Sequence, residues 1–76
     1  MEKKKEIYKL LSEYLCVHQS QINGKDGPGD HNKWDSLGHM EIIRLIENEF
    51  TLKFTIDEIL NISSVEDIVK LVNLYK

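Results

Sequence analysis

Apolar residues recur with a helical period in three stretches of the chain. The first stretch covers residues 3–15, and its apolar side chains are Ile7, Leu10, Leu11, Tyr14 and Leu15. The stretches 36–50 and 64–75 repeat the same spacing of three and four positions. This spacing places most of the apolar residues of each stretch on one face, which predicts three amphipathic helices.

Two capping patterns refine the second half of the chain. Thr55 and Glu58 have the spacing of a capping box, which predicts a short helix over residues 56–60. Ser63-Ser64-Val65-Glu66 has the same form and is expected to begin the last helix. With this short element the predicted helices number four.

Between the first two helices, residues 17–34 have no periodicity and are expected to form a structureless loop. They contain Asp26-Gly27-Pro28-Gly29, a dense turn signal. Ile22 and Trp34 are expected to anchor this loop to the core. Because no alternation typical of β-strands occurs, the pattern predicts an all-α fold: a four-helix bundle with a long first loop and a short third helix, forming a single domain over residues 1–76.

The second predicted helix has apolar residues on two faces. Its core-facing side chains are Ile42, Ile43, Ile46 and Phe50. Leu37 and Met40 fall largely on the opposite side, among polar residues. These polar neighbours are Glu41, Arg44 and Asn48, with Glu47 at the margin. Apolar residues surrounded by charge are typical of a docking surface. The alternative is that Leu37 and Met40 pack beneath the long loop.

Ser36 lies where this helix begins. The first N–H groups of a helix lack intrahelical partners and carry the positive end of the helix dipole, so a phosphate ester on Ser36 would be stabilised there. Asp35 precedes Ser36 and could cap the helix in its place. The simpler alternative is that Ser36 is itself the N-cap.

Length and charge limit the classes of function. A chain of 76 residues can build a small core but no deep substrate cavity, so a stand-alone enzyme is not expected. The net charge is −3 but unevenly distributed, with +1 over residues 1–34, −6 over 35–67 and +2 over 68–76. The acidic middle would repel a nucleic-acid backbone and favours a partner with a basic surface.

The other polar residues are expected to have structural or solvent-exposed positions. His18, His31 and His39 lack the spacing of a metal site, and His39 is expected to bond a loop carbonyl from the core side. Cys16, the single cysteine, is expected to be a small buried packing residue. No apolar stretch approaches the roughly 18 residues of a membrane span, and no signal sequence is evident, which suggests a cytoplasmic protein without membrane contact.

Asp35-Ser36-Leu37 resembles the Asp-Ser-Leu motif of acyl and peptidyl carrier proteins. The similarity covers nearly the whole chain. Further segments at the family's spacing are Glu41-Ile42-Ile43, Glu47-Asn48-Glu49-Phe50, Phe54, Ile62 and Ser63-Ser64-Val65-Glu66-Asp67-Ile68. The string Trp34-Asp35-Ser36-Leu37-Gly38-His39 is similar to that of discrete carriers in specialised bacterial pathways.

The resemblance implies that Ser36 carries a 4′-phosphopantetheine arm, with Asp35 and Leu37 beside it. A phosphopantetheinyl transferase would supply the arm from coenzyme A. An acyl- or aminoacyl-loading ligase would charge its thiol, and downstream transferases or synthases would receive the thioester from a non-catalytic carrier. The implied recognition face consists of Leu37, Met40, Glu41, Arg44 and Glu47. An acyl cargo would lie between the second and third helices, near Ile46, Phe54, Ile59 and Ile62. The alternative is that these four residues are ordinary core residues. A monomer is expected.

Some residues depart from the pattern of fatty-acid carriers. Arg44 stands where that pattern has an apolar residue, and Thr51 replaces the glycine often found after the second helix. The charge of −3 is also less acidic. These differences favour a dedicated pathway over housekeeping fatty-acid synthesis. Gly38 is expected to weaken the first turn of its helix by about 1 kcal/mol relative to alanine. The alternative is that it admits close approach of the arm or a transferase.

Two hypotheses from other classes remain beside the carrier. The first is an unmodified helical interaction module that docks through Leu37, Met40 and Glu41. The second is a small helix-turn-helix protein that binds nucleic acid. Only the number of helices suggests the second, and the acidic second and third helices oppose it.

Overall fold

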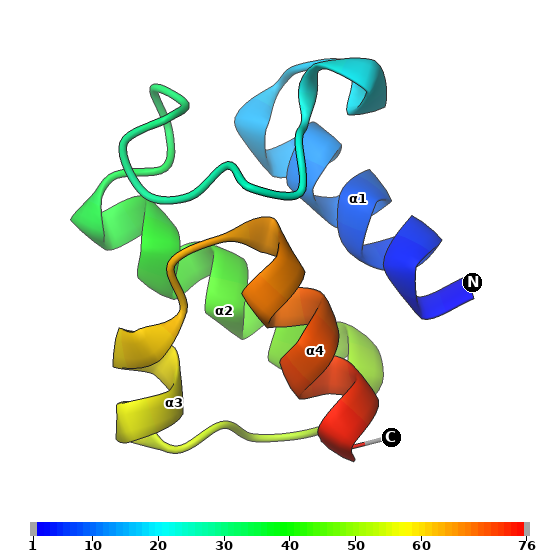
Figure 1. Ribbon diagram of the computed structural model, residues 1–76, viewed down its shortest axis with the longest axis vertical. Coiled ribbons are helices and arrows are strands. Elements are labelled where there is room, and N and C mark those ends of the chain that lie inside the picture. Colours follow the sequence, from blue (N-terminus) through cyan, green and yellow to red (C-terminus); the bar gives the residue numbers. More distant parts are fainter. Residues whose placement is uncertain (1, 76) are drawn as a thin grey trace.

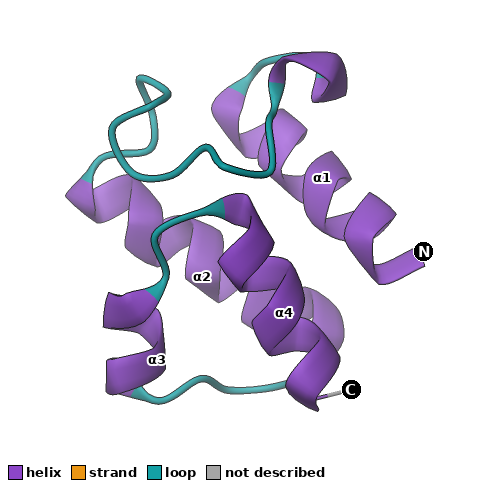
Figure 2. Ribbon diagram, viewed as in Figure 1, coloured by secondary structure: helices purple, strands orange, loops and turns teal. Residues whose placement is uncertain are grey.

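The computed structural model describes residues 2–75, and its helices surround one hydrophobic core (Figure 1). The elements are α1 (Glu2–Leu15), the 3₁₀ turn η1 (Gln19–Gln21), α2 (Ser36–Phe50), α3 (Ile56–Asn61) and α4 (Val65–Tyr75). No β-strand occurs within residues 2–75 (Figure 2). The expected all-α fold with four helices, a long first loop and a short third helix is confirmed, and each helix end agrees with the expected position within one residue.

The core lies where α1, α2 and α4 face one another. Its residues occupy the expected apolar positions of these helices: Ile7, Leu11 and Leu15 of α1, Ile42, Ile43 and Ile46 of α2, and Val65, Ile68 and Val72 of α4. From the α3 region, Phe54, Ile59 and Ile62 are also buried. Burial of a side chain of this size stabilises the fold by about 1.5–3 kcal/mol before the entropy of ordering is subtracted.

The long first loop is packed on the helices. Ile22 and Trp34 are buried, which confirms both as anchors. Gly27 lies so close to the connection between α3 and α4 that a Cβ on it would be 2.0 Å from the carbonyl oxygen of Ser63. The expectation of a loop without any regular structure was wrong at η1, where Gln21 accepts the His18 N–H at 3.0 Å. In Figure 1 the loop crosses the upper end of the molecule, above α4.

The same loop caps the last helix through its backbone. The carbonyl of Asp26 accepts the Val65 N–H at 2.8 Å, and the carbonyl of Gly24 accepts the Glu66 N–H at 2.9 Å. Both N–H groups belong to the first turn of α4, where no intrahelical acceptor exists. Asp26 is held in turn by His31, whose Nε2 lies 2.9 Å from its carboxylate. The loop therefore supplies part of the start of α4.

Side chains at the start of α4 differ from the expected capping box. Ser64 Oγ accepts the Asp67 N–H at 3.3 Å, and the Asp67 carboxylate accepts the N–H and the hydroxyl of Ser63, each at 2.9 Å. The box predicted between Ser63 and Glu66 was wrong by one position. The bonds from Ser63 hold the pKa of Asp67 below its usual range. At α3 the predicted box is confirmed, because Thr55 and Glu58 exchange both bonds.

Two helices end in residues with left-handed backbone geometry. Cys16 follows α1 with a φ of 59°, and Thr51 follows α2 with a φ of 52°. The prediction that Cys16 is buried was wrong: it is exposed, because the chain leaves the helix at this position. Its Sγ accepts a weak hydrogen bond from Lys33 Nζ at 3.7 Å. Glycine usually occupies such positions because it has no Cβ to clash.

Candidate functional site

Ser36 is the first residue of α2, and Asp35 is its N-cap. Asp35 Oδ1 accepts the Gly38 N–H at 2.7 Å. The alternative in which Ser36 caps the helix is therefore wrong. Within residues 2–75 no hydrogen bond engages the Ser36 hydroxyl, and the side chains of Asp35, Ser36 and Leu37 are exposed. The hydroxyl is thus available for chemistry without disturbing the helix start.

The first turn of α2 is built tightly against the preceding loop. Gly38 is buried, and a Cβ on it would lie 1.8 Å from the carbonyl oxygen of Lys33. The alternative in which Gly38 admits a prosthetic arm or an enzyme is wrong, since the loop backbone occupies that space. The absence of a side chain at Gly38 lets the loop turn directly into the helix and fixes the direction in which Ser36 leaves it.

An anionic group on Ser36 fits this helix end. The Asp35 side chain accepts the Gly38 N–H, and the Asp35 carbonyl accepts the His39 N–H at 2.8 Å. The N–H groups of Ser36 and Leu37, which precede these two, have no intrahelical acceptor. These groups and the positive end of the helix dipole stabilise negative charge. The donor set therefore suits a phosphate ester.

The exposed face of α2 has the composition that the helical wheel predicts. Leu37 is 80% exposed and Met40 is 47% exposed, so the alternative in which both pack beneath the loop is wrong. Glu41, Arg44 and Asn48 are exposed as well. Glu47 is half-buried, and its Oε2 accepts the Phe54 N–H at 2.8 Å. One Glu47 oxygen is therefore directed towards the connection between α2 and α3.

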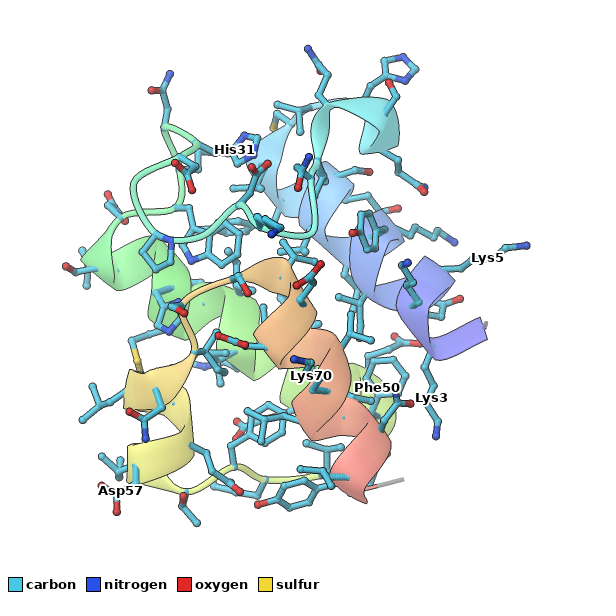
Figure 3. All side chains as sticks on the ribbon, viewed as in Figure 1. Lys3, Lys5, His31, Phe50, Asp57 and Lys70 are labelled. Atoms are coloured by element: carbon cyan, nitrogen blue, oxygen red, sulfur yellow. The ribbon has the colours of Figure 1, made fainter. Side chains whose placement is uncertain are left out.

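Sequence reasoning missed two apolar residues on α3. Ile56 is 68% exposed and Leu60 is 74% exposed, while Ile59 faces the core. The spacing of four between Ile56 and Leu60 puts both on one face, a signal that the sequence contains. In Figure 3 the neighbouring Asp57 points outward from α3, whereas Lys3 and Lys5 point outward from α1 on the other side of the molecule.

His39 links the start of α2 to both of its neighbours. The Trp34 indole Nε1–H donates to His39 Nδ1 at 3.0 Å, and His39 Nε2 lies 3.1 Å from the carbonyl oxygen of Ile59. The expected carbonyl partner was assigned to the loop, and this was wrong: the carbonyl belongs to α3. This hydrogen bond joins the first turn of α2 to the second half of α3.

Glu58 of α3 and a hollow between α3 and α4 lie beside the exposed residues of α3. The hydroxyl of Tyr75 and the N–H of Thr55 hydrogen-bond to Glu58 and keep the pKa of its carboxyl below the usual range. Ile46, Phe54 and Ile59 are buried core residues, and buried Ile62 also borders a hollow of about 240 Å³ between α3 and α4. Within residues 2–75 no cluster of three metal-ligating side chains occurs, and no helix there is long and apolar enough to cross a membrane.

Comparison with known proteins gives one finding. A family model described as "Phosphopantetheine attachment site" matches residues 5–72, which include most of α1, all of η1, α2 and α3, and most of α4. No curated protein matches the chain significantly. The match covers Ser36 and the helix end described above.

Proposed function

Because this chain belongs to the phosphopantetheine attachment family and is a carrier domain for 4′-phosphopantetheine, we propose that Ser36 Oγ is the atom to which the arm is joined. Ser36 Oγ loses its proton and attacks the β-phosphorus of coenzyme A. An oxygen–phosphorus bond forms at Ser36, the diphosphate bond breaks, and adenosine 3′,5′-bisphosphate leaves. A separate phosphopantetheinyl transferase catalyses this step, since the carrier itself is non-catalytic.

One observation carries this assignment: Asp35, not Ser36, caps α2. A capping serine would lose its bond to the helix on modification and destabilise the start of α2 by about 1 kcal/mol. Here the hydroxyl is exposed and uninvolved, and the neighbouring N–H groups stabilise the added negative charge. Modification therefore leaves the helix start intact.

We further propose that partner enzymes bind a face built from α2 and α3. Its α2 residues are Leu37, Met40, Glu41, Arg44 and Glu47, and its α3 residues are Ile56 and Leu60. Exposed apolar side chains supply buried area in a complex, and the surrounding carboxylates favour a partner with a basic surface. The partners are the transferase, a loading ligase, and the enzymes that accept the cargo. Tethering raises the concentration of the cargo at each docked enzyme.

Arg44 supports a dedicated biosynthetic pathway in place of general fatty-acid synthesis. It places an exposed positive charge on a face whose other charged residues, Glu41 and Glu47, are acidic. A partner must offer a carboxylate or an open space at this point, because an uncompensated contact between like charges weakens binding. A loading enzyme specific for this carrier would meet that requirement.

The test is the intact mass of the protein before and after incubation with coenzyme A and a broad-specificity phosphopantetheinyl transferase. We expect the wild type to gain one phosphopantetheine and Ser36→Ala to gain none. Ser20→Ala is the matched control, since Ser20 is an exposed serine of η1, and it should be modified as the wild type is. A gain of mass in Ser36→Ala would show that another residue carries the arm. No gain in a folded wild type would favour the unmodified interaction module.

A further inference from the structure

His39 is half-buried, three positions after Ser36, and the proposed attachment chemistry does not use it. Its two ring nitrogens meet groups from two different parts of the chain. One is Trp34, which ends the long loop and is completely buried, and the other is the carbonyl of Ile59 in α3. The imidazole and indole rings are nearly parallel, with 16° between their planes.

The two partners determine which ring nitrogen carries the proton. An indole N–H can only donate, so His39 Nδ1 must accept with its lone pair. A carbonyl oxygen can only accept, so Nε2 must carry the hydrogen and donate to Ile59. Both contacts are therefore satisfied by a single form, the neutral imidazole protonated at Nε2. Trp34 in this way fixes the orientation in which His39 reaches α3.

α3 depends on such contacts for its position. It has only six residues, which is too short for a stable isolated helix. Ile59 is buried, and within residues 2–75 two side-chain hydrogen bonds tie α3 to neighbouring helices: the Tyr75 hydroxyl to Glu58, towards α4, and His39 to the Ile59 carbonyl, towards α2. The His39 bond is the one that connects α3 to the turn bearing Ser36.

We propose that His39 is a positioning residue that holds α3, with Ile56 and Leu60, in register with the arm-bearing turn of α2. A transferase that binds the α2–α3 face then meets both sets of apolar residues at once. This inference rests on the proposed attachment at Ser36. Loss of the bond to Ile59 weakens recognition and leaves the reacting hydroxyl untouched, so it raises KM for the carrier protein and changes kcat little.

Three substitutions separate the two bonds. His39→Ala removes both. His39→Gln places an amide N–H near the position of Nε2, so it can still donate to Ile59 but cannot accept from Trp34. His39→Asn places an amide oxygen near the position of Nδ1, so it can accept from Trp34 but is too short for Ile59. Because the chain has one tryptophan, the indole N–H resonance of Trp34 reports its bond directly, and the carbonyl ¹³C resonance of Ile59 reports the other.

The experiment measures KM and kcat of arm transfer, at a temperature where circular dichroism shows every variant folded. We expect KM to rise about tenfold in His39→Ala, the equivalent of one hydrogen bond at about 1.4 kcal/mol. His39→Gln should restore a KM near that of the wild type, and His39→Asn should not. In the wild type at pH 8, the ¹⁵N shifts of the His39 ring should show the tautomer protonated at Nε2.

His31→Gln is the matched control. It alters a half-buried loop histidine and its contact with Asp26, away from α3, so it should lower the thermal midpoint without raising KM. A wild-type KM in both His39→Ala and His39→Asn would overturn the proposal, as would recovery in His39→Asn alone. Absence of arm transfer in the wild type would instead contradict attachment at Ser36. In that case the two resonances in the unmodified protein still decide whether His39 holds α3.

Discussion

Gly38 is constrained by the loop before it more than by the helix that contains it. In an open helix, replacing glycine with alanine stabilises by about 1 kcal/mol. Here the new Cβ would lie 1.8 Å from the Lys33 carbonyl oxygen, so either the loop or α2 must move. Overpacking of this kind costs about 1–3 kcal/mol or more, which exceeds the helical gain. Gly38→Ala should therefore destabilise the protein.

Urea unfolding checks this prediction through the free energy of unfolding. Asn48→Ala is the matched control, because Asn48 is exposed in the same helix. That substitution should stabilise the protein by a few tenths of a kcal/mol through helix propensity, roughly. A Gly38→Ala protein more stable than the wild type would mean that the close approach of Lys33 does not exist in solution.

At Thr51 a glycine would fit better than the residue present, because the Cβ of threonine strains the backbone conformation there. Its φ of 52° lies in the left-handed region, where a residue with a Cβ loses about 1–2 kcal/mol. Its position is fixed by the bonds from the Thr51 and Leu52 N–H groups to the Glu47 carbonyl that close α2. Thr51→Gly should raise the free energy of unfolding by about 1 kcal/mol, which corresponds to about 4–8 °C in the thermal midpoint.

Thr51→Ala is the control for this prediction, because it shortens the side chain and keeps the Cβ. It should produce no comparable gain in a thermal melt. If both substitutions stabilise equally, the methyl and hydroxyl groups of Thr51, and not its backbone angle, are the source of the strain.

Single residues also show the limits of prediction from sequence. Ser36, Leu37 and Met40 could be assigned to an exposed helix start because the helical period fixes their directions. Cys16 could not, since its exposure depends on where the chain leaves α1. For His39 the core-facing side was predictable, but its partner Ile59 lies 20 positions away in the chain and is brought close only by tertiary packing.

The start of α4 should respond to acid, because a carboxylate accepts hydrogen bonds there. Its Asp67 carboxylate accepts both bonds from Ser63, and these hold its pKa below the ordinary value of 3.8. A carboxyl group with a lower pKa in the folded than in the unfolded state adds stability above the unfolded value. That stability is lost as the pH falls through the folded value. The contribution of Asp67 is therefore present at pH 7, begins to fall as the pH approaches the ordinary value of 3.8, and is lost as the pH falls through the lower folded-state value.

Asp67→Asn should lower the free energy of unfolding by about 0.5–1 kcal/mol at pH 7, a modest value because Asp67 is only partly buried and water screens its charge. The difference from the wild type should shrink towards zero as the pH is lowered past the carboxyl range. Urea unfolding at several pH values measures this. A constant difference from pH 7 to pH 3 would show that the charge of Asp67 contributes nothing.

The bounds of a helix could be predicted where its apolar residues recur with a helical period on the face that packs against the core. Capping residues placed the start of α3 correctly, and the helical period gave the bounds of α2. The start of α4 was misplaced by one residue because Ser63 and Ser64 are both good caps. Only the packing of the loop, through Gly27 and the Gly24 carbonyl, decides between them.

Over the whole molecule, acidic and basic groups are separated. The segment 35–67 has a charge of −6, whereas the first 34 residues sum to +1. Figure 3 shows Lys3 and Lys5 of the first turn of α1 on the side away from Asp57 of α3. This separation gives an approaching enzyme a preferred orientation before contact. The radius of gyration, 11.1 Å, is that of a compact chain of this length.

Glu41→Gln should slow arm transfer at low salt and make its rate less dependent on salt concentration. The expected loss in kcat/KM is about two- to fivefold, typical of a charge at the rim of an interface. Glu13→Gln is the control, because Glu13 is an exposed residue of α1 and its substitution changes the net charge by the same amount. It should have little effect on the rate of arm transfer. Equal losses in both variants would indicate that only the net charge matters. The rates are compared between 20 mM and about 500 mM salt, where screening differs strongly.

The hydrogen bonds that the Gly24 and Asp26 carbonyls accept from the first turn of α4 also bear on how the protein folds and opens. The carbonyl groups and the Val65 and Glu66 N–H groups are far apart in the chain, so the bonds can form only after the loop has closed over the core. We therefore expect the first turn of α4 to be completed late in folding. In the native protein, the Val65 and Glu66 amides should exchange with deuterium at the rate at which the loop opens, and report that opening from the far end of the sequence.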